Sequence, residues 1–187
     1  LEFTADIFVK RDNLRAAKDA YAEVLKSDPN RHSSRIRLGQ TMIRLEMPEE
    51  AEKHLQIVLK SLNNSDVAGY FYVKSLLDQK KYAQSEKFLL KWINDHPNKT
   101  WATVAYSRTL ELTDRFNEAE GLLKKSLKKA DDEKEILIRL AELNLNRLKL
   151  KEALEVAAMT EKKYPNDARN KLLLGQLYQK LGAKQKA

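Results

Sequence analysis

Three histidines are the side chains in this sequence best suited to metal binding or proton transfer. They stand at His32, His54 and His96, far apart along the chain. A metal-binding pair on one helix needs two ligands about one turn apart, and no two of these histidines have that spacing. The sequence contains no cysteine, which excludes disulfides, thiolate zinc sites and thiol catalysis. We therefore expect no metal site.

Neighbouring carboxylates are the other candidates for chemistry, and they occur at Glu49–Glu50 and Asp131–Asp132. Both pairs stand at predicted helix starts, where negative charge interacts favourably with the helix dipole. The glycines are isolated, so no phosphate-binding loop is present, and no nucleophile stands beside a base in a catalytic motif. We expect a protein that is not an enzyme, with no catalytic residues and no cofactor.

A basic run, LLKKSLKKADDEKE at 122–135, stands out in a chain whose net charge is +8. Its lysines are Lys124, Lys125, Lys128 and Lys129. We interpret them as the solvated outer face of a helix, with phosphate contacts to RNA as the alternative. The run lacks the interleaved aromatic residues on which bases stack, so nucleic acid is not the expected partner.

The whole chain repeats with a period of 34 residues, and the repeat is what positions these side chains. One column of small residues is Ala17, Ala51, Ser85, Ala119, Ala153 and Ala187. A second is Ala5, Gly39, Val73, Ser107, Ala141 and Gly175, in which only the valine is not small. A column of turn formers is Pro29, Asn63, Pro97, Asp131 and Pro165. Such self-similarity indicates a solenoid of stacked supersecondary units.

Within each unit the apolar residues recur with a helical period, as at Leu137, Leu140, Ala141 and Leu145. A second helical stretch follows, so each repeat is predicted to be a helical hairpin and the fold to be all-α, with about eleven helices. Helices that pack about 8–10 Å apart need small side chains where they cross. We expect the small columns, with Gly39 and Gly175 among them, to lie at these crossings.

The pattern resembles the tetratricopeptide repeat (TPR) family. The matching segments are RLGQTM, YAQSEKFLLKWINDHPN, FNEAEGLL, LKEALEVAAMTEKKYP and LLLGQLY. The resemblance covers all 187 residues in one phase. It implies a right-handed superhelical solenoid of helix-turn-helix repeats, with about 5.5 repeats in this chain.

We predict one solenoid domain over 1–187, which we interpret as a piece of a longer repeat protein because no polar capping repeat is visible. Apolar side chains near its end would then be exposed and would allow self-association through the solenoid ends; they are Leu172, Leu173, Leu177 and Leu181. The predicted units are 1–31, 32–65, 66–99, 100–133, 134–167 and 168–187.

The resemblance further implies that the first helices of the repeats line a concave groove. Carried over by repeat phase, the candidate groove residues are Arg37, Gln40, Arg44, Tyr70, Lys74, Trp101, Arg108 and Glu142. Aromatic and cationic groups together suit a protein or peptide partner with an acidic segment. For Tyr70 and Trp101, packing against the facing helix is an equal alternative.

One binding mode of the family, recognition of Hsp70 and Hsp90 tails, uses a lysine and an asparagine, then an asparagine, then a lysine and an arginine in three successive units. No three successive units of this chain supply that set. We therefore expect the partner not to be such a chaperone tail.

We interpret the chain as a non-catalytic scaffold that binds a peptide or protein segment in the concave groove. One alternative is a bacterial envelope TPR protein that organises polysaccharide export or secretion, and a second is RNA binding by the basic outer face. No segment reads as a signal peptide or a membrane helix, so we expect no membrane insertion. Cytoplasm and bacterial periplasm are both allowed.

The small columns lead to a test by substitution. Ala153→Leu places a large side chain at a predicted helix crossing and is expected to destabilise the protein by about 1–3 kcal/mol through overpacking. Chemical denaturation measures this difference, and an unchanged unfolding midpoint would contradict the placement of Ala153.

Overall fold

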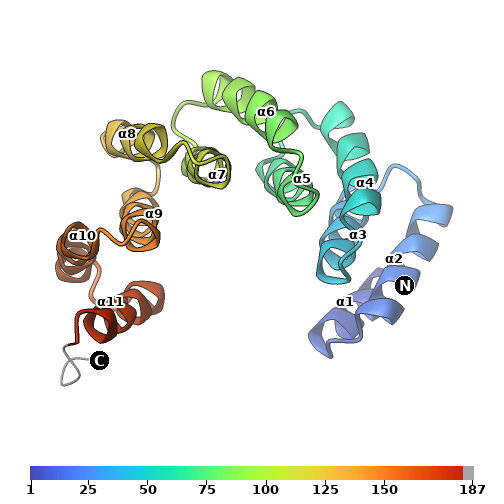
Figure 1. The fold of residues 1–187 in the computed structure, drawn as a ribbon. Helices are drawn as coiled ribbons and strands as arrows, with labels where there is room; N and C mark the ends of the chain where they lie inside the picture. The colour runs from blue at the N-terminus through green and yellow to red at the C-terminus, as the bar shows by residue number, and fades with distance from the viewer. Residues whose placement is uncertain (183–187) are drawn as a thin grey trace. The chain divides into compact units, whose positions relative to one another are not determined.

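The computed structural model describes residues 1–182 and contains eleven helices and no strand in that range (Figure 1). The prediction of an all-α fold of helix-turn-helix repeats is confirmed for these residues. The helices are α1 (Glu2–Lys10), α2 (Leu14–Ser27), α3 (His32–Arg44), α4 (Pro48–Ser61), α5 (Asp66–Asp78), α6 (Tyr82–Asp95), α7 (Thr100–Leu112), α8 (Phe116–Ser126), α9 (Glu133–Asn146), α10 (Leu150–Lys163) and α11 (Ala168–Lys180).

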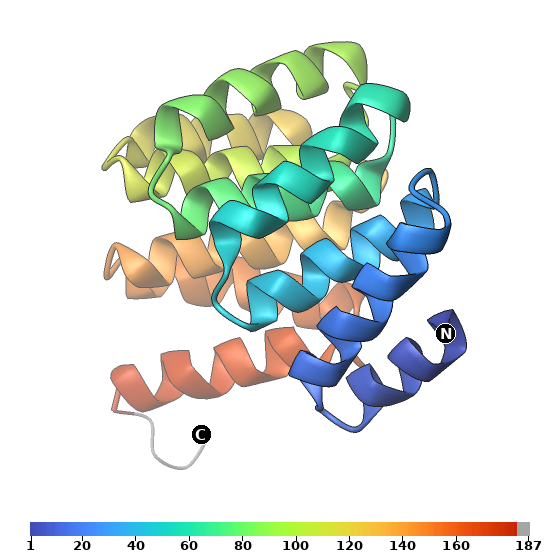
Figure 2. The same cartoon turned by 90° about the vertical axis from the view of Figure 1, so that its right-hand side faces the viewer.

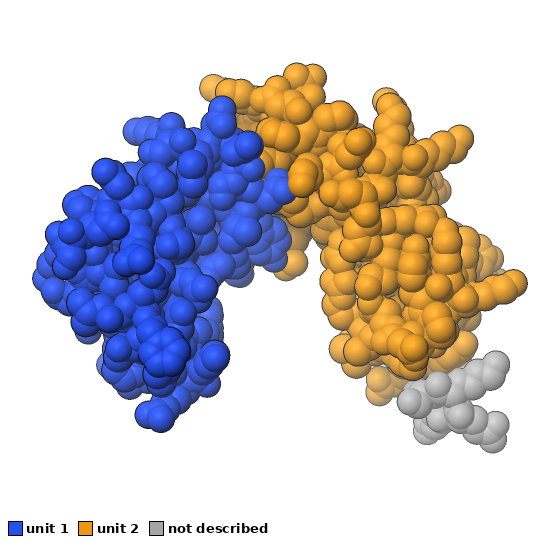
Figure 3. All heavy atoms as spheres, turned by 180° about the vertical axis from the view of Figure 1, so that it is seen from behind, with its two compact units in different colours: residues 1–85 blue, residues 86–187 orange. Residues whose placement is uncertain are grey.

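The chain divides into two compact units, Leu1–Ser85 and Glu86–Ala187, which Figure 3 colours separately. Helix α6 begins in unit 1 and ends in unit 2. Each unit is described below by itself.

Within each unit the helices pack as hairpins that stack on one another. In unit 1, α1 packs with α2 and α3 with α4, while α2 also packs on α3 and α4 on α5 (Figure 2). In unit 2 the same order links α7 to α8, α9 to α10, and each second helix to the first helix that follows. Each helix therefore buries one face within its hairpin and another against the next repeat.

The first helix of each hairpin ends in the same way, with one residue in the left-handed conformation. These residues are Asp12, Glu46, Lys80, Asp114, Leu148 and Gly182, each 34 positions after the last and with φ between 58° and 74°. The amide that follows closes the helix end, as when Asn13 N donates to Phe8 O at 2.9 Å and Lys149 N to Asn144 O at 2.9 Å. This is the Schellman arrangement, which satisfies the last carbonyls and reverses the chain. Sequence reasoning missed this column because only Gly182 is a glycine.

The turn-former column lies where the sequence predicts. Pro29, Asn63, Pro97, Asp131 and Pro165 each stand between the second helix of one repeat and the first helix of the next. In the fourth of these turns, Asp131 accepts a hydrogen bond from Thr100 N at 3.0 Å and Asp132 N donates to Thr100 Oγ1 at 3.0 Å. These bonds tie the turn to the start of α7, the first helix of the same repeat.

Apart from Gly175, which is partly buried, the described members of both small columns lie in the core. Ala17, Ala51, Ser85, Ala119 and Ala153 are fully buried. The same holds for Ala5, Ser107 and Ala141, and Val73 is nearly so. Ala187, the last member of the first column, lies outside the described residues. The expected helix crossings are therefore confirmed for the described members of the first column.

The two glycines expected at helix crossings differ in their surroundings. A Cβ added at Gly39 would lie 2.9 Å from Leu55 Cγ, and Leu55 is fully buried in α4. A Cβ added at Gly175 would have no atom within 4 Å. The helix that would cross α11 at Gly175 is the second helix of the same repeat, which lies outside the described residues, so the crossing predicted at Gly175 stays a prediction.

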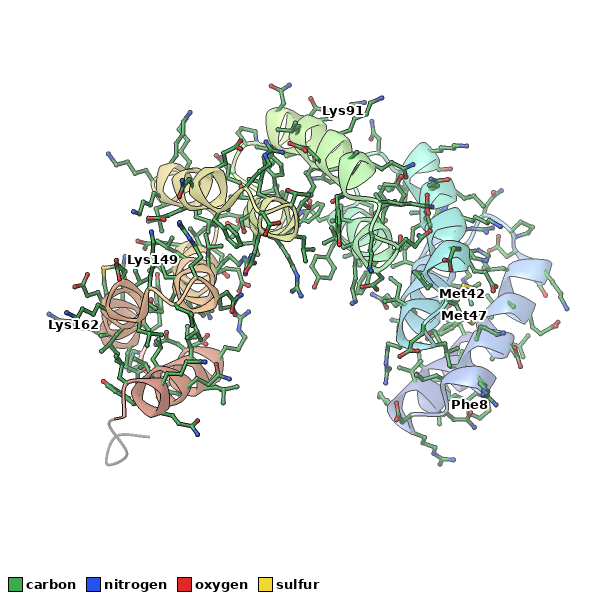
Figure 4. The ribbon with its side chains drawn as sticks, in the orientation of Figure 1. Phe8, Met42, Met47, Lys91, Lys149 and Lys162 are labelled. Carbon is green, nitrogen blue, oxygen red and sulfur yellow. The ribbon has the colours of Figure 1, made fainter. Side chains whose placement is uncertain are left out.

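The core of unit 1 gathers around Leu38, Met42 and Leu55, with Phe8 and Met47 packed against it (Figure 4). Met42 lies on α3 and Met47 directly precedes α4, so the flexible thioethers fill space on both sides of one turn.

The apolar side chains of α11 are less exposed than the sequence led us to expect. Leu173 is 5% exposed and Leu177 is fully buried, because both pack with Ala141, Ala153 and Ala157 in the core of unit 2. Leu172 and Leu181 are exposed, as expected. No helix among the described residues is long and apolar enough to cross a bilayer.

The contrast between the two glycines gives a paired prediction. Gly39→Ala is expected to destabilise the protein by about 1–2 kcal/mol, because the new methyl group overlaps the buried Leu55. Gly175→Ala is expected to stabilise it by about 0.5–1 kcal/mol, because alanine loses less backbone entropy in a helix and meets no neighbour. Urea unfolding of both variants measures the two signs, and equal shifts would contradict the packing difference.

Candidate functional site

Five of the predicted groove residues lie on the first helices of unit 1. Arg37, Gln40 and Arg44 stand on α3, and Tyr70 and Lys74 stand on α5, which packs against α3. All are exposed except Gln40, which is partly buried. The repeat phase therefore brings these residues together on two adjacent helices.

The arginines of this set are held by carboxylates of the preceding repeat. Arg37 Nη1 lies 2.8 Å from Asp6 Oδ1, and Arg44 Nη2 lies 2.6 Å from Asp12 Oδ1. Asp6 also accepts a hydrogen bond from the buried Tyr21 hydroxyl. Burial and the hydrogen bond to Asp6 raise the pKa of Tyr21 to about 12. The two arginines thus join repeats as well as facing outward.

The other two members of the set in unit 1 also have neighbours. Lys74 Nζ lies 3.6 Å from Asp78 Oδ2, one turn further along α5. Tyr70 keeps 47% of its surface exposed and meets the ring of Phe71 edge-on, with 5.0 Å between the centroids. An aromatic ring that packs on one neighbouring ring and is otherwise exposed offers a surface on which an apolar group of a partner can pack.

Unit 2 carries Trp101 and Arg108 on α7 and Glu142 on α9. The Trp101 ring packs edge-on against the buried Trp92 with centroids 5.3 Å apart, so much of it serves the core. Arg108 is exposed and has no ion pair with any described carboxylate. Arg108 is thus the one predicted cation in the set that no described side chain neutralises.

Glu142 belongs to a polar cluster between α7 and α9. Its carboxylate lies 3.5 Å from Nη1 of Arg139, which is only 6% exposed. Arg139 also donates to Ser107 Oγ at 3.0 Å and to the carboxylate of Glu111. Asn146 Nδ2 donates to Glu111 at 2.7 Å. These bonds satisfy a nearly buried guanidinium and fix the spacing of the two first helices.

A second polar network joins the second helices of successive repeats. Glu52 lies 2.7 Å from Lys81 Nζ, and Glu86 lies 2.7 Å from Arg115 Nη1. Glu120 lies 3.1 Å from Lys149 Nζ and 2.9 Å from Arg147 Nη1. In each case a cation directly precedes the second helix of the next repeat, so three like pairs link consecutive repeats.

Sequence reasoning missed these pairs although their signal is periodic. The glutamates stand at 52, 86 and 120 and the cations at 81, 115 and 149, both with the 34-residue spacing. The hydrogen bonds from Arg115, helped by Tyr106, lower the pKa of Glu86. Hydrogen bonds from Lys124 and Lys149 likewise lower the pKa of Glu120. These carboxylates therefore remain charged well into acid.

Two of the three histidines, His54 and His96, contact neighbouring side chains. Burial and the nearby Arg35 lower the pKa of His54, whose Nδ1 lies 3.3 Å from Arg35 Nη1. His96 stacks on Trp92 with 4.9 Å between ring centroids. No group of three potential metal ligands occurs among the residues that the structure describes.

The lysines of the basic run lie on or just after α8. Lys124 pairs with Glu120 at 2.6 Å, and Lys125, Lys128 and Lys129 are exposed or partly so. Lys91 on α6 and Lys162 on α10 also point away from the helices of unit 2 (Figure 4). Lys124 and Lys125 occupy the last turn of α8, where cations interact favourably with the helix dipole.

Comparison with known proteins gives matches to solved structures alone. No family model and no curated protein matches the sequence. PilW, a widely conserved type IV pilus biogenesis factor, is 20% identical over 100% of this chain and 86% of its own, with a TM-score of 0.74. A thermophilic TPR protein of Thermus thermophilus is 18% identical over 94% of this chain and 96% of its own, with a TM-score of 0.75. YrrB, a TPR protein with an unusual peptide-binding site, is 15% identical over 90% of this chain and 87% of its own, with a TM-score of 0.58.

These similarities, together with the repeat of helical hairpins, define the fold. The chain has the tetratricopeptide-repeat fold, as its resemblance to that family led us to expect.

The link between Glu86 and Arg115 gives a prediction that depends on pH. Because the folded pKa of Glu86 is lowered below its usual 4.5, its stabilising effect is complete above that value and is lost as pH falls through the folded pKa. Glu86→Gln is therefore expected to destabilise the protein by about 1 kcal/mol at pH 7. The difference from the unchanged protein should shrink as pH falls below about 4. Thermal unfolding between pH 3 and pH 7 measures it.

Glu118→Gln is the matched control. Glu118 shares the partner Arg115 at 2.8 Å but is well exposed, so its loss should matter less at pH 7. An equal effect of the two substitutions, or a Glu86→Gln difference that persists at low pH, would contradict the role given to Glu86.

Proposed function

We propose that this chain is a non-catalytic scaffold that binds a protein or peptide segment through the exposed faces of its first helices. The single observation that carries the proposal is the state of Arg108, an exposed cation of α7 without an ion pair among the described residues. Arg37, Arg44 and Lys74 each have an internal carboxylate within 4 Å. A cation that has no internal partner is available to an acidic group of a partner.

Two further features support the proposal. Tyr70 keeps nearly half of its surface exposed on α5, in unit 1, and an amphipathic ring is a frequent anchor in protein interfaces. YrrB, which shares the fold, has a peptide-binding site. The partner proposed here is a protein or peptide with an acidic segment that contacts Arg108.

The proposal is tested by capturing partners with the full chain and identifying them by mass spectrometry, followed by titration of the purified partner. Arg108→Glu is expected to weaken binding by about tenfold or more, because an attractive charge contact becomes repulsive. Tyr70→Ala is expected to weaken it by a smaller factor.

Lys91→Glu is the matched control for this experiment. It makes the same change of charge on α6, where the side chain points outward from unit 2 (Figure 4). Binding that is unchanged by Arg108→Glu but lost in Lys91→Glu would move the interface to the second helices and overturn the proposal.

A second candidate role is a scaffold in the bacterial envelope that organises polysaccharide export or secretion. It is favoured by the match to PilW, a type IV pilus biogenesis factor, which extends over 100% of this chain. Fractionation of source cells distinguishes this role, because a protein recovered only with cytosolic complexes would not serve it.

A further inference from the structure

Within each unit, successive first helices meet near their ends at a corner that recurs with the repeat. The first position of the corner is the left-handed residue that ends a first helix. The second position is 32 residues later, in or just after the last turn of the next first helix. In the first corner, Asp12 and Arg44 form an ion pair at 2.6 Å. The repeat thus has a position at which an acidic group and a cation can join successive hairpins.

Where this ion pair is absent at a later corner within a unit, the residue at the position of Arg44 still has a polar partner. Asp78 lies 3.6 Å from Lys74, and Asn146 donates to Glu111 at 2.7 Å. The corner between α9 and α11 differs, because Leu148 replaces the aspartate and Lys180 stands in the place of Arg44. Lys180 is exposed and has no carboxylate partner among residues 1–182.

Leu148 is poorly suited to its position. Its φ is 58°, in a region that leucine disfavours and that aspartate and asparagine tolerate better. Its side chain is 71% exposed, so core packing does not explain the leucine. A large apolar side chain held exposed in a strained conformation is a feature often found at binding sites.

The corner of Leu148 and Lys180 also contains a pocket. A pocket of about 710 Å³ is lined by Leu145, Asn146, Leu148, Gln176, Gln179 and Lys180. It contains two leucines, three side-chain amides and one cation. Amides both donate and accept hydrogen bonds, which matches the alternating groups of a peptide backbone.

We infer that this pocket binds an acidic side chain of a partner peptide, whose carboxylate pairs with Lys180 as Asp12 pairs with Arg44 in the first corner. An aliphatic residue next to the acidic one packs on Leu148, and Asn146, Gln176 and Gln179 bond to the backbone. The inference rests on the proposed protein-binding function and names a second contact point and its chemistry, separate from Arg108.

The direct test uses two synthetic probes, acetyl-Leu-Asp-Leu-amide and acetyl-Leu-Asn-Leu-amide, titrated into the isotope-labelled full chain and followed by NMR. The aspartate probe is expected to shift the amide signals of Leu148, Gln176, Gln179 and Lys180. The asparagine probe should bind about tenfold more weakly, because a charge-assisted hydrogen bond is roughly twice as strong as a neutral one.

Four variants sharpen the test. Leu148→Asp supplies the missing carboxylate from within, so it should raise the melting temperature and abolish binding of the aspartate probe. Leu148→Asn has the same tolerance of the backbone conformation without the charge, and it should retain part of the binding. Lys180→Gln should abolish the preference for the aspartate probe, whereas Lys171→Gln, which removes another exposed lysine of α11, should not.

Three results would overturn the inference: equal binding of the two probes, no binding of either, or an aspartate preference that survives in Lys180→Gln. Its failure is distinguishable from failure of the proposed function. A captured partner that binds Lys180→Gln normally but Arg108→Glu weakly would leave the scaffold role standing and remove the pocket from it.

Discussion

The close crossing of two helices in each repeat is the constraint on which the rest of the structure depends. The crossing needs a small residue on the second helix, and Ala17, Ala51, Ala119 and Ala153 are all fully buried there. Where α3 packs on α4, even a methyl group at Gly39 would overlap Leu55. Because every hairpin is closed in this way, its two outer faces stay at a fixed spacing and can stack on the next hairpin.

Polar contacts then fix how successive hairpins meet. The second helices are linked by the pairs Glu52–Lys81, Glu86–Arg115 and Glu120–Lys149, and α7 and α9 are linked through the nearly buried Arg139. Partly buried ion pairs of this kind add modest stability and define a single register, since a shifted stack would leave charges unpaired.

These ion pairs also determine which charged side chains lack a partner within the protein and are available to a binding partner. Equivalent positions recur in every repeat of such a protein. A charged residue that is paired within the protein in one repeat but not in another therefore marks a charge that a partner could neutralise. Arg44 and Lys180 occupy the same place in their repeats, yet only Arg44 has a carboxylate from the preceding repeat. Arg108 and Lys74 also occupy the same place in their repeats, and Lys74 is paired with Asp78 of its own helix, whereas Arg108 has no carboxylate partner among the described residues. A cation without an internal partner keeps its charge free for an acidic group, which is the basis of the two proposals.

The sequence by itself determined the helical hairpins, the 34-residue phase, the turns and the small columns, because backbone propensity and burial pattern are local and repeat in every unit. It also placed Arg37, Tyr70, Arg108 and the other candidate groove residues on the first helices of their repeats, where the structure has them. Only the tertiary structure decided which of those charges are paired, that a methyl group at Gly39 would overlap Leu55, and that Leu148 and Lys180 line one pocket. These facts depend on distances between side chains of different repeats, which residue spacing along one chain does not contain.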